Sequence, residues 1–165
     1  MRILPLFAFA TMSACGITVG GDYGTDAFQD VPVADASFAS ILNNYRATVG
    51  AQAVQFDSRL NDAAQAHAQD MVDRDYFSHT TKGGTDDVRD RMIAAGYNPT
   101  AWGENIAGRQ STEADVLQDW IDSDTPAPGT PVSHKDILEG ASFEDFGLGV
   151  AVGDESRWVL VMGAE

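Results

Sequence analysis

Cysteine is nearly absent from this chain of 165 residues, and the single one is Cys15. A lone thiol cannot close a disulfide within the chain, which excludes internal disulfides from the fold. Hydrophobic residues make up 44% of the sequence, enough at this length to bury one core but hardly two. We therefore expect one folded domain and a tail.

Basic residues are also scarce, since 10 lysines and arginines stand against 25 aspartates and glutamates. A surface with a net charge of −15 repels phosphate backbones and anionic lipid headgroups, so no nucleic-acid partner is expected. Solubility is the simplest explanation of this acidity. An interaction domain that acts through its acidic surface is a weaker alternative.

Long hydrophobic runs are missing as well. The apolar stretch at residues 3–12 follows Arg2 and is too short to cross a bilayer, and two small residues come after it, which predicts a signal peptide over residues 1–14. Residues 12–15 resemble a bacterial lipobox, in which Cys15 becomes the acylated N-terminus. A lipid anchor at Cys15 would then attach the protein, with a net charge of −16 once Arg2 is removed, to a membrane. An ordinary signal peptide with an incidental thiol is the alternative.

Residues 15–36 show neither helical nor alternating periodicity and are rich in Gly, Asp, Ala and Val. This composition predicts a flexible tether, whose average reach is on the order of 25 Å. The tether would hold a domain at residues 37–165 clear of a membrane surface.

Apolar residues recur at helical spacing in four segments of that domain. The predicted helices cover residues 37–49, 58–74, 85–95 and 112–121, with Ser37, Thr85 and either Ser111 or Thr112 as N-caps and Gly50 and Gly96 as terminators. His67 falls on the apolar face of the second helix. A histidine in that position is more typical of a hydrogen-bonded core residue than of a ligand.

The C-terminal part changes to the periodicity of β-strands. Residues 146–152 and 158–162 are separated by a turn cluster at 153–156, which predicts an antiparallel hairpin, and residues 105–107 supply a further short strand. Residues 124–131 contain three prolines and are expected to form an exposed loop. Helices early and strands late indicate an α+β domain with a small antiparallel sheet covered by helices.

Several motifs together resemble the CAP superfamily, which comprises the cysteine-rich secretory, antigen 5 and pathogenesis-related proteins, in its bacterial form. They are Leu-Asn-Asn-Tyr-Arg at 42–46, Tyr-Phe-Ser-His at 76–79, Gly-Glu-Asn-Ile-Ala at 103–107, His134 ahead of Ile137 and Leu138, and Phe-Gly-Leu-Gly-Val at 146–150. The resemblance covers about residues 38–163 and implies a three-layer α-β-α sandwich. The disulfides of the secreted eukaryotic members are absent.

In that family two histidines and two glutamates line a central cavity, which in several members is similar to a divalent metal site. The resemblance places His79, Glu104 and His134 in this cavity, and Ser123 where the second glutamate would stand. It also places Trp102 and Asn105, which flank Glu104, in the cleft.

A physical argument also favours a site around Glu104. A carboxylate beside Trp102 in a partly buried setting is costly when ionised unless an imidazolium or a metal accompanies it. Two neutral imidazoles and one carboxylate form a common first shell for zinc with an open position. We therefore predict that His79, Glu104 and His134 bind zinc or another divalent cation. In the alternative, these three side chains hydrogen-bond to one another and only tie the loops to the sheet.

Two classes of function remain. The first is a noncatalytic binding module of the bacterial envelope, whose cleft holds a small ligand, peptide, lipid or glycan. The second is a metal-dependent hydrolase, peptidase-like or esterase-like, with Glu104 and His79 as catalytic residues. The sequence contains no His-Glu-x-x-His motif, and no acid with a recognisable orienting role follows a Ser123–His134 pair, so the binding module is favoured. A monomer is expected because no heptad pattern occurs.

Overall fold

The structure is a computed structural model, and it describes residues 36–126 and 130–165. The predicted signal peptide, Cys15 and almost all of the predicted tether lie outside the described residues. Within the two described ranges, every helix is too short or too polar to cross a bilayer.

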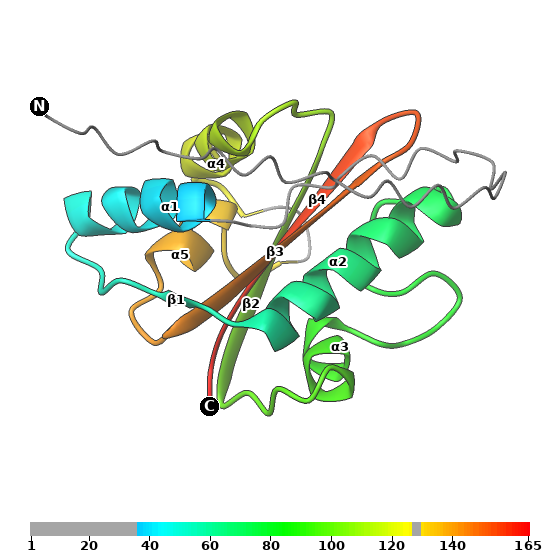
Figure 1. Ribbon diagram of the computed structural model, residues 1–165, viewed down its shortest axis with the longest axis horizontal. Helices are drawn as coiled ribbons and strands as arrows, with labels where there is room; N and C mark the ends of the chain where they lie inside the picture. The colour runs from blue at the N-terminus through cyan, green and yellow to red at the C-terminus, as the bar shows by residue number, and fades with distance from the viewer. Residues whose placement is uncertain (1–35, 127–129) are drawn as a thin grey trace, which may run out of the picture.

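The described elements are helices and the strands of a single sheet (Figure 1). In chain order they are α1 (Ala36–Thr48), β1 (Gln55–Phe56), α2 (Ser58–Asp73), α3 (Val88–Ala94), β2 (Ala101–Gly108), α4 (Glu113–Asp122), α5 (His134–Glu139), β3 (Asp145–Val152) and β4 (Ser156–Ala164).

The sheet has the strand order β1-β3-β4-β2. The predicted hairpin is confirmed, because β3 and β4 pair antiparallel around the turn, and β2 pairs antiparallel with β4. The strand predicted at residues 105–107 is confirmed and is longer than expected. The two-residue strand β1 pairs parallel with β3 and was not predicted. The order leaves β2 at one edge of the sheet, where the cleft described below is found.

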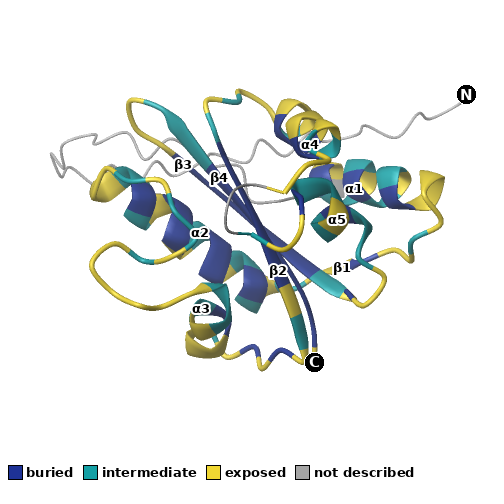
Figure 2. Cartoon of the chain, turned by 180° about the vertical axis from the view of Figure 1, so that it is seen from behind, coloured by how far each residue is buried: buried dark blue, intermediate teal, exposed yellow. Residues whose placement is uncertain are grey.

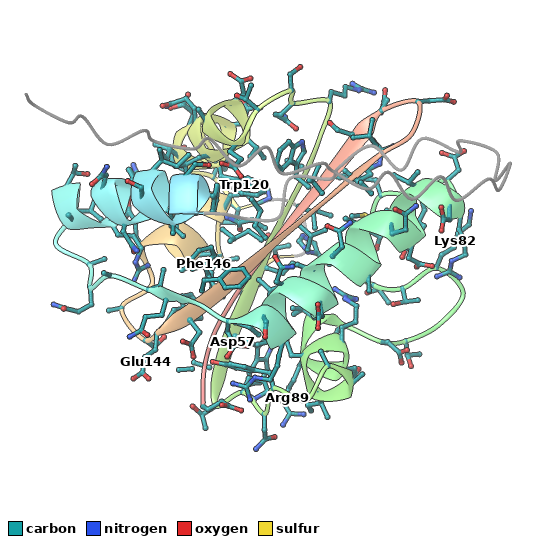
Figure 3. The ribbon with its side chains drawn as sticks, viewed as in Figure 1. Asp57, Lys82, Arg89, Trp120, Glu144 and Phe146 are labelled. Atoms are coloured by element: carbon teal, nitrogen blue, oxygen red, sulfur yellow. The ribbon has the colours of Figure 1, made fainter. Side chains whose placement is uncertain are left out.

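Helices cover both faces of the sheet. In Figure 1, α1, α4 and α5 lie on one side of the strands and α2 and α3 on the other. Successive side chains along each strand point to opposite faces of the sheet, and a hydrophobic cluster lies on each face. Trp120 of α4 and Phe146 of β3 (Figure 3) belong to the first cluster. Val159 and Val161 of β4 belong to the second. The two central strands, β3 and β4, are accordingly mostly buried, whereas the outer faces of the helices are exposed (Figure 2). The predicted α+β class and the three-layer α-β-α sandwich are confirmed.

Two glycines of β3 explain how α2 packs so closely on the sheet. A Cβ atom on Gly147 would lie 2.1 Å from the backbone nitrogen of Asn61, and one on Gly149 would lie 2.3 Å from that of Gln65. Both atoms belong to the backbone of α2 and cannot move aside. The Gly-Leu-Gly pattern therefore allows direct backbone contact between strand and helix.

The predicted helices at residues 37–49, 58–74 and 112–121 are confirmed as α1, α2 and α4, and Thr112 is the N-cap of α4. Two predicted caps are wrong. Ser37 lies inside α1, which already includes Ala36. Asp87, not Thr85, caps α3, because its carboxylate accepts a hydrogen bond from the backbone N–H of Asp90 and the Asp90 carboxylate accepts one from the backbone N–H of Asp87.

Helix α5 was not predicted. Its N-cap is Ser133, whose hydroxyl accepts from the backbone N–H of Asp136, while the Asp136 carboxylate accepts from the backbone N–H of Ser133. This capping box follows the proline-rich loop and fixes the direction in which α5 begins. The first residue of α5 is His134.

Arg46 of α1 is fully buried, and its guanidinium contacts the end of α5. Its Nε donates to the carbonyl of Gln52 at 2.7 Å, and its Nη atoms donate to the carbonyls of Leu138 and Gly140. Burial lowers the pKa of Arg46. Because the last carbonyls of a helix have no partner within it, the guanidinium satisfies groups that α5 would otherwise leave open.

Candidate functional site

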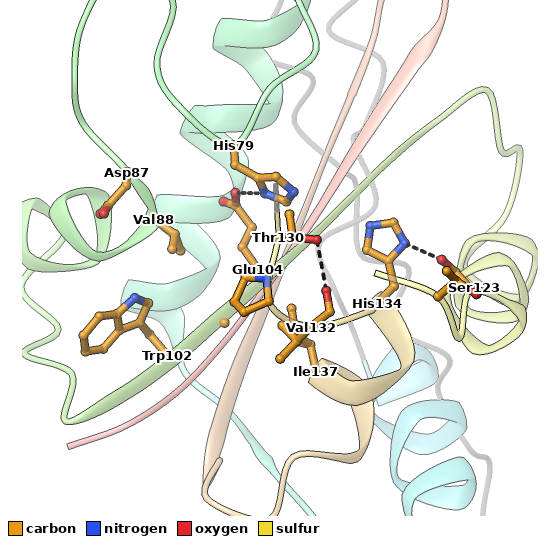
Figure 4. Close-up of a pocket in the computed structure, with 13 residues that line it drawn as sticks. His79, Asp87, Val88, Trp102, Glu104, Ser123, Thr130, Val132, His134 and Ile137 are labelled. Atoms are coloured by element: carbon orange, nitrogen blue, oxygen red, sulfur yellow. Dashed lines mark hydrogen bonds and ion pairs between the residues drawn. The ribbon is translucent and has the colours of Figure 1, made fainter. Parts of the chain in front are cut away.

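A cavity of about 300 Å³ lies at the edge strand β2, between the loop that leads into α3 and the start of α5 (Figure 4). Five of the six residues predicted for the cleft line it, namely His79, Trp102, Glu104, Ser123 and His134. Asn105 is fully buried and does not line the cavity. The segments that carry these residues are distant in sequence and meet at β2.

Glu104 forms the buried base of this cavity, with a side chain that is 1% exposed. One carboxylate oxygen lies 2.8 Å from Nδ1 of His79, and the other accepts from Nη2 of Arg91 at 2.7 Å. An ionised carboxylate can only accept hydrogen bonds, so Nδ1 of His79 carries the proton in this contact, and in the neutral imidazole Nε2 keeps its lone pair. The side chain of His79 is 42% exposed, and its Nε2 is turned into the cavity (Figure 4).

His134 reaches the cavity from the other face of the sheet. Its Nδ1 lies 3.2 Å from Oγ of Ser123, and Nδ2 of Asn105 donates to its backbone carbonyl at 3.0 Å. Burial lowers the pKa of His134, and the nearby His79 lowers it further, which favours a neutral imidazole. Figure 4 shows the rings of His79 and His134 facing each other, each with its Nε2 toward the cavity.

Of the three side chains predicted as cation ligands, two present a ring nitrogen to the cavity and the third is occupied by protein partners. Among residues 36–126 and 130–165, no cluster of three or more His, Cys, Asp or Glu side chains has the arrangement of a metal centre. Both oxygens of Glu104 are already engaged by His79 and Arg91. Histidines that bind metals typically hold their second nitrogen against a carboxylate or another polar group, and His79 and His134 have this arrangement.

The same geometry bears on nucleophilic catalysis. Oγ of Ser123 contacts Nδ1 of His134, so a candidate nucleophile and a candidate base lie side by side. In the described part of the chain, no carboxylate hydrogen-bonds to His134 to orient it as a base. The pair therefore lacks the third member of a catalytic triad.

Apolar side chains form the mouth of the cavity. Trp102 is 43% exposed, and the guanidinium of Arg89 lies 5.2 Å from its ring centroid. Val88 and Ile137 lie on the two sides of β2 and also line the cavity. A ligand in this cleft would thus contact polar nitrogen atoms at the base and apolar surface at the mouth.

His67 does not line the cavity. It is 1% exposed, and its Nε2 lies 2.9 Å from the carbonyl of Ser78, next to His79. The prediction of a buried, hydrogen-bonded histidine is confirmed for Nε2, whereas Nδ1 has no partner within the described residues. Burial is the main cause that lowers the pKa of His67.

Sequence reasoning missed Arg91. This residue lies one turn into α3, and nothing in the local sequence separates it from Arg89, which is stacked on Trp102 instead. Its partner Glu104 is 13 residues away on β2. Only the folded arrangement of α3 against β2 identifies the pair.

Comparisons with known proteins agree with the fold and the motifs. The CAP model, described as the cysteine-rich secretory protein family, matches residues 39–162. The Bacillus subtilis protein YkwD is 29% identical over 127 residues, which are 76% of this chain and 45% of YkwD.

Solved structures give the same result. An extracellular protein of Bacillus anthracis with an SCP domain is similar with a TM-score of 0.63 and 26% identity, over 78% of this chain and 39% of that chain. An outer surface protein of Borrelia burgdorferi shares the fold with a TM-score of 0.65 and 18% identity, over 78% of this chain and 90% of that chain. This chain spans less than half the length of the two Bacillus relatives. It belongs to the CAP superfamily, in its bacterial form.

Proposed function

We propose that this chain is an exported binding module whose cleft holds a small ligand at a divalent cation bound by Nε2 of His79 and Nε2 of His134. One observation carries the proposal: each ring has its Nδ1 held by a protein group and its Nε2 directed into the same cavity. A bound cation would supply positive charge and open coordination positions for a ligand group or water.

The roles of the surrounding residues follow from their contacts. Glu104 would hold His79 in the tautomer that leaves Nε2 free, and the Ser123 hydroxyl, 3.2 Å from Nδ1 of His134, would accept its proton and leave the second Nε2 for the cation. Trp102 and Val88 offer apolar surface for the rest of the ligand. In this proposal Glu104 supports a ligand histidine, whereas the prediction from the resemblance makes Glu104 a ligand itself.

Calorimetric titration of Zn²⁺ into metal-free protein tests the proposal. We expect one binding event, lost in His79→Ala and in His134→Ala. The matched control is Asp154→Asn, because Asp154 is an exposed acid away from the cleft and reports loose cation binding to an acidic surface. Binding that persists in both histidine variants, or that falls as much in Asp154→Asn, would refute the cleft as the metal site.

The hydrolase remains a second candidate because of the Ser123–His134 contact at 3.2 Å. It predicts slow turnover of a small ester or peptide that is lost in Ser123→Ala. Turnover that requires added Zn²⁺ and survives in Ser123→Ala would instead indicate water activated at a metal. No turnover above the uncatalysed rate, with Zn²⁺ binding intact, leaves the binding module.

Export and anchoring form a separate part of the proposal. The Bacillus anthracis relative is described as an extracellular protein, which supports export. The lipobox-like sequence at residues 12–15 supports acylation of Cys15. Metabolic labelling with a fatty acid should label the wild-type protein and not Cys15→Ala. Equal labelling of both would contradict the anchor, and absence of label in both would favour ordinary secretion.

A further inference from the structure

Arg91 contacts both ends of the loop that carries His79. The segment from His79 to Asp86 lies between α2 and α3, and most of it is exposed. Nη2 of Arg91 donates to the backbone carbonyl of His79 at 3.0 Å, and Nη1 donates to that of Asp86 at 3.3 Å. Arg91 therefore ties both ends of this loop to α3.

The same arginine also acts on the His79 ring through Glu104. Nη2 of Arg91 donates to one oxygen of Glu104 at 2.7 Å, and the other oxygen accepts from Nδ1 of His79 at 2.8 Å. His79 is thus held twice by Arg91, once at its own carbonyl and once through the carboxylate that meets its ring.

We propose that Arg91 is a positioning residue, which fixes the ring orientation and tautomer of His79 and thereby sets the cation affinity of the cleft. The part that concerns affinity rests on the proposed function. With one oxygen of Glu104 occupied by Arg91, the carboxylate presents a single oriented acceptor to Nδ1. Without Arg91, the buried carboxylate lacks a charged partner and no longer has a fixed orientation.

The planar guanidinium is required for this role. Its fork reaches Glu104 and the two loop carbonyls at the same time, whereas a lysine ammonium is a compact charge on a flexible stem. The remaining donor, Nε of Arg91, is buried and has no partner within the described residues. A buried donor left open costs stability. Arg91 therefore makes its contacts through the Nη atoms, while its Nε remains an unsatisfied donor.

The test uses Arg91→Gln and Arg91→Lys, with Arg109→Gln as the matched control. Arg109 also pairs with a glutamate, Glu155, but its side chain is 77% exposed and lies away from the cleft. Two quantities are measured at pH 8: the tautomer of His79 by long-range ¹H–¹⁵N correlation spectra of metal-free protein, and the dissociation constant for Zn²⁺ by calorimetry. Thermal unfolding checks that each variant is folded.

We expect His79 of the wild-type protein to carry its proton on Nδ1, and Arg91→Gln to show a mixture of tautomers with affinity for Zn²⁺ reduced about 10-fold to 100-fold. Arg91→Lys should recover part of the tautomer preference, and Arg109→Gln should match the wild type. The proposal is overturned if folded Arg91→Gln keeps the wild-type tautomer, or if metal-free wild-type protein carries the His79 proton on Nε2. The second result needs no variant to fold.

The two proposals fail in different ways. If the wild-type protein binds no Zn²⁺, the proposed function is wrong, yet the tautomer comparison still decides whether Arg91 positions His79. If Zn²⁺ binds through both histidines and Arg91→Gln binds it equally well, the proposed function stands and Arg91 has no role in affinity.

Discussion

Glu104 and Asn105 are neighbours on β2, and each holds one of the two cleft histidines from opposite faces of the sheet. Glu104 contacts Nδ1 of His79, and Nδ2 of Asn105 donates to the backbone carbonyl of His134. Successive side chains of a strand point to opposite faces, so one dipeptide organises both layers. The Gly-Glu-Asn motif thus connects the α2–α3 side of the molecule with the α5 side.

This relationship predicts that Asn105→Ala weakens cation binding through His134, although Asn105 does not line the cavity. Removing the amide leaves the carbonyl of His134 without that partner, and we expect a stability loss of about 1–3 kcal/mol. Chemical denaturation and Zn²⁺ titration would measure both effects. Asn98→Ala, at an exposed position, is the control. Wild-type affinity in a folded Asn105→Ala variant would contradict this role.

Substitution of a β3 glycine should disrupt the contact between sheet and α2. In Gly147→Ala the new methyl group would meet the backbone of Asn61, so we expect a loss of about 3 kcal/mol or more, or a failure to fold. Gly84→Ala is the control, because the nearest atom to a Cβ there is 3.8 Å away. Urea unfolding compares the two. A Gly147→Ala variant as stable as Gly84→Ala would show that α2 can shift away from the strand.

Arg46→Met tests the buried guanidinium between α1 and α5. Methionine fills a similar volume but leaves the carbonyls of Leu138 and Gly140 unpaired, and we expect a loss of about 3 kcal/mol. Arg109→Met, which removes an exposed arginine, should cost less than about 1 kcal/mol. The loss of unfolding free energy in each variant is measured by chemical denaturation. Equal losses would contradict a special role for Arg46.

Acid should destabilise the domain through His67. Burial lowers the pKa of His67 in the folded state, so the unfolded chain binds the proton more readily. Its contribution to stability is fully present above about pH 6.5 and declines as the pH falls from there toward the folded-state pKa. The slope from one such proton is at most about 1.4 kcal/mol per pH unit. The pKa of His134 is lowered in the same direction.

In His67→Gln the dependence of unfolding free energy on pH should be shallower between pH 7 and pH 5 than in the wild type. The comparison concerns the slope, because the substitution also changes the contact with Ser78. Urea unfolding at a series of pH values measures this slope for both proteins. Parallel slopes in the two proteins would mean that His67 takes up its proton equally in both states.

The parts of the fold that sequence patterns predicted are those with local causes. Helix α2 has a long apolar stripe, and the β3–β4 hairpin has two β-type runs around a polar turn, so neither depends on distant contacts to be identified. Strand β1 has two residues and exists only because β3 lies beside it. Helix α5 has six residues, too few for periodicity, and its capping box at Ser133 and Asp136 was the one local signal available.

The candidate site likewise has a part that the sequence predicted and a part that it did not. His79, Glu104 and His134 were found through motifs, and all three line the cavity. The geometry between them was beyond sequence reasoning, because Arg91 occupies one oxygen of Glu104 from a helix whose position depends on the whole second core. The expected ligand triad became, in the proposal, two ligands and a supporting acid.

The placement of β2 at the sheet edge has a mechanical consequence. His79 is attached to the layer of α2 and α3, and His134 begins α5 in the opposite layer, so the sheet separates the hydrophobic clusters beneath them. An ion shared by the two imidazoles would be a crosslink between these halves. Occupancy would then raise the temperature at which both halves melt and make them melt together.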